Sequence, residues 1–183
     1  MDIGTIITII IIIIIIIIII IFGMAMMKPD TFHVIRKLKM KAAPEKIFPY
    51  VNDFKMWKMW SPYEKLDPSM KSSFTGEMSG KGAKYAWVGN DKVGAGNMEI
   101  VESTPPNRIL LNLNFDKPMK ANNMTEFTFV QEGEETTVTW HMYGNSNMMG
   151  KLMQVFMSMD NLVGKDFDTG LMNLKGIVEG PSV

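Results

Sequence analysis

The sequence from residue 150 to residue 175, GKLMQVFMSMDNLVGKDFDTGLMNLK, carries an apolar residue at every third or fourth position. The repeated set is Leu152, Phe156, Met159, Val163, Phe167, Leu171 and Leu174. This spacing predicts one amphipathic helix of about six turns with a single apolar face. Gly164 and Gly170 lie inside it, where each glycine costs about 1 kcal/mol relative to alanine. We therefore expect the helix to approach another element closely at these positions.

The sequence before this helix predicts seven β-strands. Strand propensity and alternating polarity place them at residues 31–41, 71–75, 83–88, 95–103, 108–115, 124–131 and 136–143. Most of the links between them are short and rich in glycine, proline or asparagine, which is typical of turns. Strands joined by such links usually pair with their neighbours, so we expect an antiparallel meander.

The predicted strands have one apolar face and one polar face. Val138, Trp140 and Met142 point to one side of the last strand, and the residues between them are threonine and histidine. This alternation is typical of a sheet that packs on one face and meets water on the other. One long helix is too narrow to fill the concave face of a curved seven-stranded sheet. We therefore expect a cavity between helix and sheet, which is the geometry of a binding site.

Two short helices are predicted between the first two strands. Residues 44–52 begin with Pro44 in the first turn, where its missing amide hydrogen is tolerated. Residues 53–60 form the second short helix, which we expect to stop at Ser61 and Pro62. The predicted fold class is therefore α+β, with a curved antiparallel sheet, two short helices and a long C-terminal helix.

This order of elements resembles the helix-grip fold of the START-like superfamily, which includes the birch pollen allergen, lipid-transfer domains and polyketide cyclases. Local sequence is similar to its SRPBCC, polyketide cyclase/dehydrase-like branch over about residues 31–178. The matching segments are APEKIF (43–48), VNDF (51–54), WKMWSPYE (57–64), YAW (85–87), GNMEI (96–100), VTW (138–140) and MDNLVGKDF (159–167). The resemblance implies the fold, but not one activity, because the superfamily includes transport, storage, cyclisation and regulatory proteins.

The N-terminal segment predicts a single-pass membrane anchor. Residues 3–27 contain no charged side chain, and residues 9–21 are all isoleucine. About twenty apolar residues suffice to cross a bilayer as a helix. A cleavable signal peptide is the alternative, but its shorter apolar region usually follows positive charge, and only Asp2 precedes this one. We expect an anchor at residues 1–29 and a ligand-binding domain at residues 30–180.

The side of the membrane is less clearly indicated. Lys28 and several basic residues follow the apolar segment, and no lysine or arginine precedes it. The positive-inside rule then favours a cytoplasmic domain. However, most of these basic residues lie in the first predicted strand, where the rule is weak, so the orientation stays open.

Composition excludes several classes of function. The formal net charge is zero and no basic stripe is present, which argues against nucleic-acid binding. The chain has no cysteine, so thiolate metal sites and cysteine nucleophiles are excluded. Two isolated histidines, His33 and His141, make no convincing metal site. The glycine-rich segment at residues 76–82 lacks P-loop spacing and predicts a hairpin turn. We expect no metal and no cofactor.

The candidate ligand-binding residues are mainly aromatic or methionine. Trp57, Trp60, Tyr63 and Glu64 form the tightest cluster, and in this fold they lie near a cavity mouth. The alternative is that both tryptophans only close the core beneath the short helices. Nineteen methionines favour an adaptable apolar wall, although methionine also replaces leucine in ordinary cores. The remaining candidates are Tyr85, Trp87, Met98, Trp140, Met142, Met153, Met157 and Asp160.

These residues predict non-catalytic binding of a hydrophobic small molecule or lipid beside the membrane. The enzyme alternative is a cyclase- or dehydratase-like reaction, in which a cavity carboxylate such as Glu64, Glu99 or Asp160 has a raised pKa. The sequence shows separate carboxylates and no converging acid–base pair, so it assigns no catalytic residue. A third alternative is a scaffold whose filled cavity binds nothing. No particular protein partner is indicated.

Overall fold

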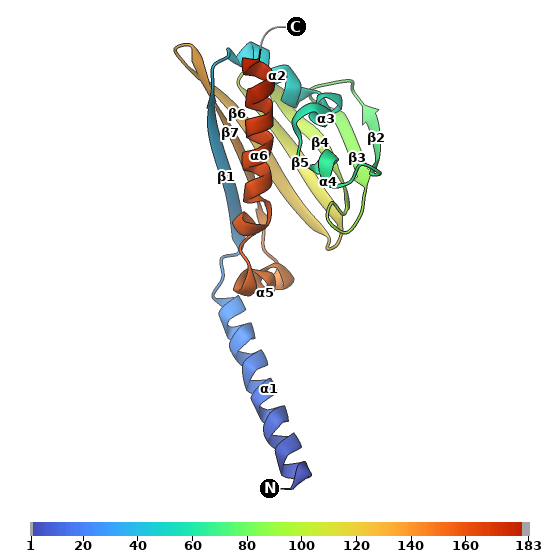
Figure 1. The fold of residues 1–183 in the computed structure, drawn as a ribbon, viewed down its shortest axis with the longest axis vertical. Helices are drawn as coiled ribbons and strands as arrows, with labels where there is room; N and C mark the ends of the chain where they lie inside the picture. The colour runs from blue at the N-terminus through green and yellow to red at the C-terminus, as the bar shows by residue number, and fades with distance from the viewer. Residues whose placement is uncertain (1, 181–183) are drawn as a thin grey trace.

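The computed structural model describes residues 2–180, and a seven-stranded antiparallel sheet dominates the soluble part. Its order is β1-β7-β6-β5-β4-β3-β2, so the first and last strands are neighbours (Figure 1). The strands are β1 (Thr31–Met40), β2 (Lys71–Gly76), β3 (Ala83–Val88), β4 (Ala95–Thr104), β5 (Arg108–Lys117), β6 (Ala121–Glu132) and β7 (Glu135–Asn145). The predicted fold class is confirmed.

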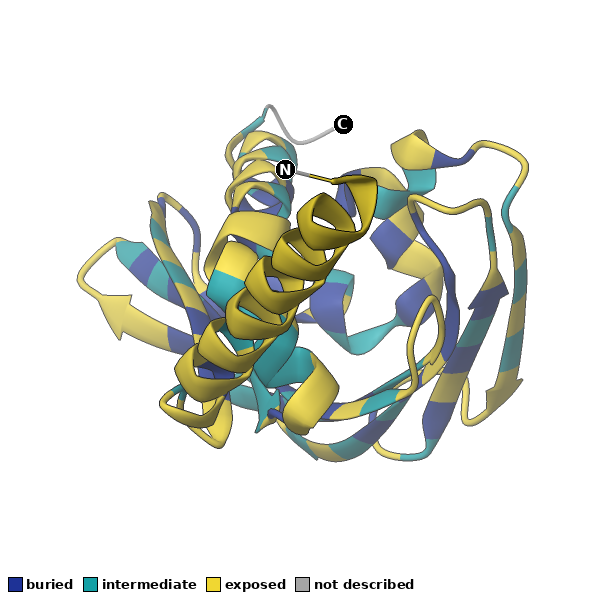
Figure 2. Cartoon of the chain, turned by 90° about the horizontal axis from the view of Figure 1, so that it is seen from below, coloured by how far each residue is buried: buried dark blue, intermediate teal, exposed yellow. Residues whose placement is uncertain are grey.

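The apolar residues of the strands share the concave face. In β7 the buried residues Val138, Trp140 and Met142 alternate with partly exposed ones, and β5 repeats the pattern. Figure 2 shows this alternation as bands of different burial along the strands. In the register, Trp140 lies opposite Phe127 of β6 and Arg36 of β1. Trp140 and Phe127 therefore form an aromatic pair on this face, with their ring centroids 5.0 Å apart.

The segment between β1 and β2 differs partly from the prediction. Helix α2 (Pro44–Asn52) is present, with Pro44 in its first turn. The second predicted helix is instead a 3-10 turn, η1 (Phe54–Met56), followed by α3 (Trp57–Trp60). A further turn of helix, α4 (Tyr63–Leu66), was not predicted. The helical segment ends at Trp60 before Ser61 and Pro62, as predicted, and Pro62 is also the N-cap residue of this new turn.

The long C-terminal helix was predicted as one element, and this is wrong. It consists of α5 (Met148–Phe156) and α6 (Met159–Glu179). Met157 between them is extended, with φ −151° and ψ 129°, and the Ser158 side chain caps α6 by accepting a hydrogen bond from the Asn161 amide. Because the helix breaks here, Phe156 does not cover the sheet as predicted and is 73% exposed.

Helix α6 packs closely on the β1–β7 side of the sheet, and both of its predicted close approaches are confirmed. A Cβ atom on Gly170 would lie 2.9 Å from the Trp140 ring, and one on Gly164 would collide with the Arg36 guanidinium. Arg36 crosses the helix there and pairs with Asp160 at 2.7 Å and with Asp168 at 3.0 Å. These ion pairs hold the N-terminal half of α6 to the edge strand.

Helix α1 (Ile3–Met26) extends from one end of the domain (Figure 1). Among the described residues, it is the one helix long and apolar enough to cross a membrane. Its isoleucines up to Ile20 are exposed, whereas Ala25 in its last turn is fully buried. Helix α5 is its main neighbour. The helix is therefore a candidate single-pass membrane segment, although a signal sequence shares these properties.

Truncation of Phe167 should destabilise the fold far more than truncation of Phe156. Phe167 is 2% exposed, so Phe167→Ala should cost about 3–5 kcal/mol of unfolding free energy. Phe156→Ala, the matched control, should cost less than about 0.5 kcal/mol because its ring lies outside the core. Urea unfolding of the full chain in mild detergent measures both, and similar losses would contradict the assigned packing.

The domain should fold without its N-terminal segment. The sheet, α2 and α6 share one buried apolar cluster to which α1 contributes no residue. A chain that starts at Pro29 should therefore unfold cooperatively, as followed by the emission of its four tryptophans, all of them buried. An unfolded shorter chain would place the domain boundary elsewhere.

Candidate ligand-binding cavity

A cavity of about 340 Å³ lies between the concave face of the sheet and the helices. This volume is within the range of small-molecule sites, near its lower end. Its sheet wall consists of Tyr85, Trp87, Met98, Leu113, Phe115, Thr125, Trp140 and Met142. Its helical wall includes Phe54, Trp57, Tyr63, Glu64, Met153, Leu162, Val163, Asp166 and Phe167. Most of these side chains are apolar or aromatic, which favours an apolar ligand.

The β3 side of the cavity is a rigid aromatic wall. Tyr85 and Trp87 stack with their ring centroids 5.8 Å apart, and the Trp87 indole N–H donates to the Val93 carbonyl at 3.3 Å. Gly96 on β4 leaves room for this indole, because a Cβ atom there would lie 2.7 Å from the Trp87 ring. Pre-positioned rings of this kind give a ligand contact area at little conformational cost.

The two tryptophans of α3 have different places. Trp57 lines the cavity and donates its indole N–H to the Val51 carbonyl at 3.0 Å. Trp60 lies outside the lining, fully buried in the core, and donates to the Tyr50 carbonyl at 2.9 Å. The predicted cavity position of Trp60 is therefore wrong, because its ring packs against Phe127 and Trp140 beneath the helix.

Two buried polar atoms of the lining have no hydrogen-bond partner among the described residues. They are the indole nitrogen of Trp140 and the hydroxyl of Thr125. The two residues lie on adjacent strands, since Thr125 is opposite Met142 and Trp140 is two residues earlier on β7. An unpaired buried polar group costs about 1–3 kcal/mol. Both atoms lie behind the cavity surface, because neither has accessible surface of its own.

A small group of ionisable residues lines the cavity between β3 and the helices α4 and α6. The Tyr85 hydroxyl donates to Glu64 at 3.3 Å. Burial, and then the charge of Glu64, raises the pKa of Tyr85. Burial, and then the charge of Asp166, raises the pKa of Tyr63. Burial also raises the pKa of Asp166. Perturbed groups lining one cavity are typical of functional sites, although structural networks produce them as well.

Two other predicted site residues lie outside the lining. Met157 falls in the break between α5 and α6 and is exposed, because the single helix expected there does not exist. Asp160 faces Arg36, whose hydrogen bonds lower the pKa of that carboxylate. The structure brings the others together around the cavity, namely Trp57, Tyr63, Glu64, Tyr85, Trp87, Met98, Trp140, Met142 and Met153.

Several lining residues were not identified from the sequence. Leu113 and Phe115 belong to the apolar face of a predicted strand, so the alternation could have indicated them. No pattern in the sequence indicated Asp166, because the direction of its side chain depends on where α6 begins. Glu99, considered as a cavity acid, pairs instead with Lys84 at 3.4 Å. Residues 2–180 contain no cluster of three potential metal ligands.

Comparison with models of protein families agrees with the fold described above. The profile described as "Polyketide cyclase / dehydrase and lipid transport" matches residues 31–179, which is most of the chain. The chain belongs to this family. No curated protein sequence matches it.

Solved structures share the fold at low sequence identity. The protein CV1439 from Chromobacterium violaceum is 16% identical with a TM-score of 0.59, covering 84% of this chain and 100% of its own. The protein TTHA0849 from Thermus thermophilus is 19% identical with a TM-score of 0.59, covering 83% and 100%. The di-domain ARO/CYC BexL from the BE-7585A biosynthetic pathway is 12% identical with a TM-score of 0.63, covering 87% and 54%.

Replacing Trp140 by phenylalanine should cost less stability than the same change at Trp60. Both substitutions replace a buried indole by a smaller ring, but only Trp60→Phe leaves a partly buried carbonyl without its donor. The difference in unfolding free energy should be about 1–3 kcal/mol in favour of Trp140→Phe. Urea unfolding followed by far-ultraviolet circular dichroism measures it, and equal losses would mean that the Trp140 indole N–H has a partner.

Proposed function

We propose that this protein binds a hydrophobic small molecule or lipid in the cavity between its sheet and C-terminal helix. The observation that carries the proposal is the 340 Å³ cavity with an aromatic and methionine-rich wall. Transfer of apolar surface from water into such a cavity contributes about 25 cal/mol for each Å² buried. Flexible Met98, Met142 and Met153 beside rigid indoles suit a range of ligand shapes.

We further propose that α1 is an uncleaved membrane anchor for this binding domain. Its 24 residues have a mean hydropathy of 3.8 in the most apolar window. Helical isoleucines insert favourably into lipid, at about −0.5 kcal/mol per central residue. An anchored cavity stays where apolar ligands are concentrated, because such molecules partition into the bilayer.

Acid–base catalysis is the second candidate function. Glu64 and Asp166 are two of the three carboxyl groups in the lining, the third being Asp91, and the raised pKa of Asp166 favours a proton donor. If the domain dehydrates a bound carbonyl compound, mass spectrometry will recover a product lighter by one water, and Asp166→Asn will abolish it. A ligand recovered unchanged favours binding alone.

Filling the cavity should abolish ligand binding without disturbing the fold. Val163→Phe places a larger side chain at the helical wall, and Val130→Phe makes the same change at an exposed strand position. A polyene fatty acid that accepts energy from tryptophan should bind the parent chain and Val130→Phe equally. Its affinity for Val163→Phe should fall about tenfold or more, corresponding to about 1.4 kcal/mol.

Equal affinity in the two variants would show that the probe binds elsewhere. Saturable energy transfer that is lost only in Val163→Phe supports binding in the cavity, provided that circular dichroism shows both variants to be folded. The absence of any saturable binding to the parent chain would favour a scaffold with a non-functional cavity.

A further inference from the structure

Helix α5 is amphipathic, but its orientation is the reverse of that expected in water. Its apolar residues occupy one side, and none of its residues is buried. Met149 is 55% exposed and Phe156 is 73% exposed. A surface helix of a soluble domain normally turns its apolar face to the core and its charged face to solvent.

The polar side of α5 instead faces the protein. The Lys151 side chain is only 13% exposed and pairs with Asp30 at 2.5 Å. The Gln154 amide donates to the Ser146 hydroxyl at 2.6 Å. The Ser146 amide donates in turn to the Asp30 carbonyl at 2.7 Å. These contacts fix the rotation of the helix, so its apolar side is held outward.

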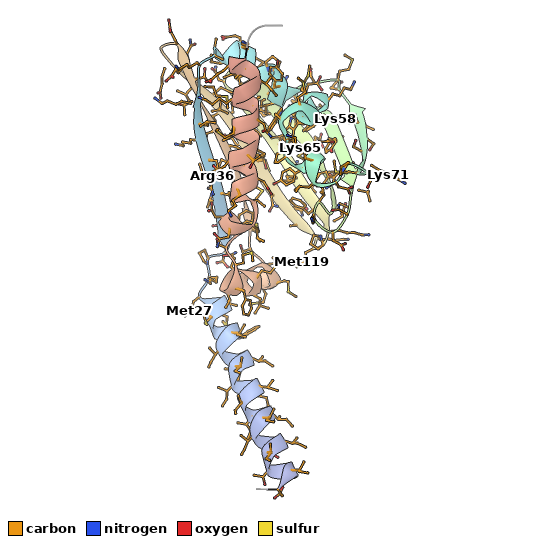
Figure 3. The ribbon with its side chains drawn as sticks, in the orientation of Figure 1. Met27, Arg36, Lys58, Lys65, Lys71 and Met119 are labelled. Atoms are coloured by element: carbon orange, nitrogen blue, oxygen red, sulfur yellow. The ribbon has the colours of Figure 1, made fainter. Side chains whose placement is uncertain are left out.

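The position of α5 indicates what covers this apolar side. It packs against the end of α1, where Ala25 is fully buried. A helix of 24 residues is about 36 Å long, slightly more than the roughly 30 Å hydrocarbon core. When α1 spans the bilayer, its last turn therefore reaches the headgroup layer and brings α5 to that depth. Figure 3 places Met27 at this junction, and Met119 of the β5–β6 loop at the same end of the domain.

We propose that α5 lies in the membrane interface with Met149 and Phe156 inserted among the lipids. The proposal rests on the anchoring of α1 proposed above and adds a second, in-plane contact. Interfacial helices of this kind bury an apolar face about 5–10 Å into the headgroup and acyl boundary. The bilayer is the favoured occupant because the segment against which α5 packs is itself a candidate span.

This arrangement also assigns a source for the ligand. Met153 of α5 is partly exposed and also lines the cavity, and Leu162 near the start of α6 does the same. On the sheet side of the cavity, the lining includes Pro118, which is next to Met119 in the β5–β6 loop. The cavity wall therefore reaches the end of the domain that faces the bilayer, and an apolar ligand enters from lipid rather than from water.

The absence of native cysteine allows a direct test with single-cysteine variants of the full chain. Met149→Cys and Phe156→Cys are labelled with an environment-sensitive dye and reconstituted in phosphatidylcholine vesicles with or without spin-labelled lipid. Ile13→Cys reports on the span. Met78→Cys is the matched control, since Met78 is 81% exposed in the β2–β3 turn. We expect spin-labelled lipid to reduce the emission at positions 13, 149 and 156 at least twofold, and to leave position 78 unchanged.

Three results would overturn the proposal in distinguishable ways. Quenching at position 13 alone would leave the anchor in place and exclude insertion of α5. Absence of quenching at position 13 would contradict the proposal that α1 spans the membrane, and with it the proposal for α5. It would not bear on ligand binding in the cavity. Labels at 149 and 156 that are shielded from iodide but not quenched by lipid would identify a protein contact instead.

The route of the ligand has its own test. In Met149→Gln/Phe156→Gln, transfer of the polyene fatty acid from vesicles to the full chain should slow at least fivefold. Its equilibrium affinity in detergent should stay unchanged, because neither residue lines the cavity. An unchanged transfer rate would mean that the ligand does not enter past α5.

Discussion

Phe167 of α6 lies flat on Trp140 of β7, with ring centroids 3.9 Å apart and ring planes 7° apart. This contact fixes the long helix off-centre, over the side of the sheet formed by β1 and β7. Gly170 permits it by leaving room beside the Trp140 ring, and the Arg36 ion pairs hold the same helix to β1. The apolar faces of β3, β4 and β5 are left without a long helix above them. The cavity exists because the short helices α3 and α4 close this region only in part.

The break between α5 and α6 connects the cavity with α1. Ser158 starts α6 anew, so α5 is free to leave the sheet and pack on the end of α1. A single uninterrupted helix would have carried Phe156 toward the sheet and left α1 without this contact. The same break places Met153 at once in the cavity lining and on the exposed side of α5. Helix α1 and the cavity are thus related through one short helix.

The sheet was largely predictable from the sequence, because alternating polarity encodes a one-sided sheet residue by residue. Tyr85, Trp87, Trp140 and Met142 could be placed at the cavity for that reason. The helix break was not predictable, since Phe156 and Met159 keep the apolar spacing of three to four residues across it. Asp160 was misplaced because its partner Arg36 is distant in sequence. The sequence could not show that Trp57 lines the cavity while Trp60 lies in the core. The directions of the two side chains depend on a 3-10 turn that has no distinct sequence pattern.

We propose that the cavity holds an apolar molecule while the chain is anchored in the membrane. Mass spectrometry of the intact full chain, released from membranes in mild detergent, is the decisive measurement. We expect one tightly held apolar molecule per chain, released only when the protein unfolds. A mass equal to that of the bare chain under the gentlest conditions, together with no apolar molecule in an organic extract, would contradict it.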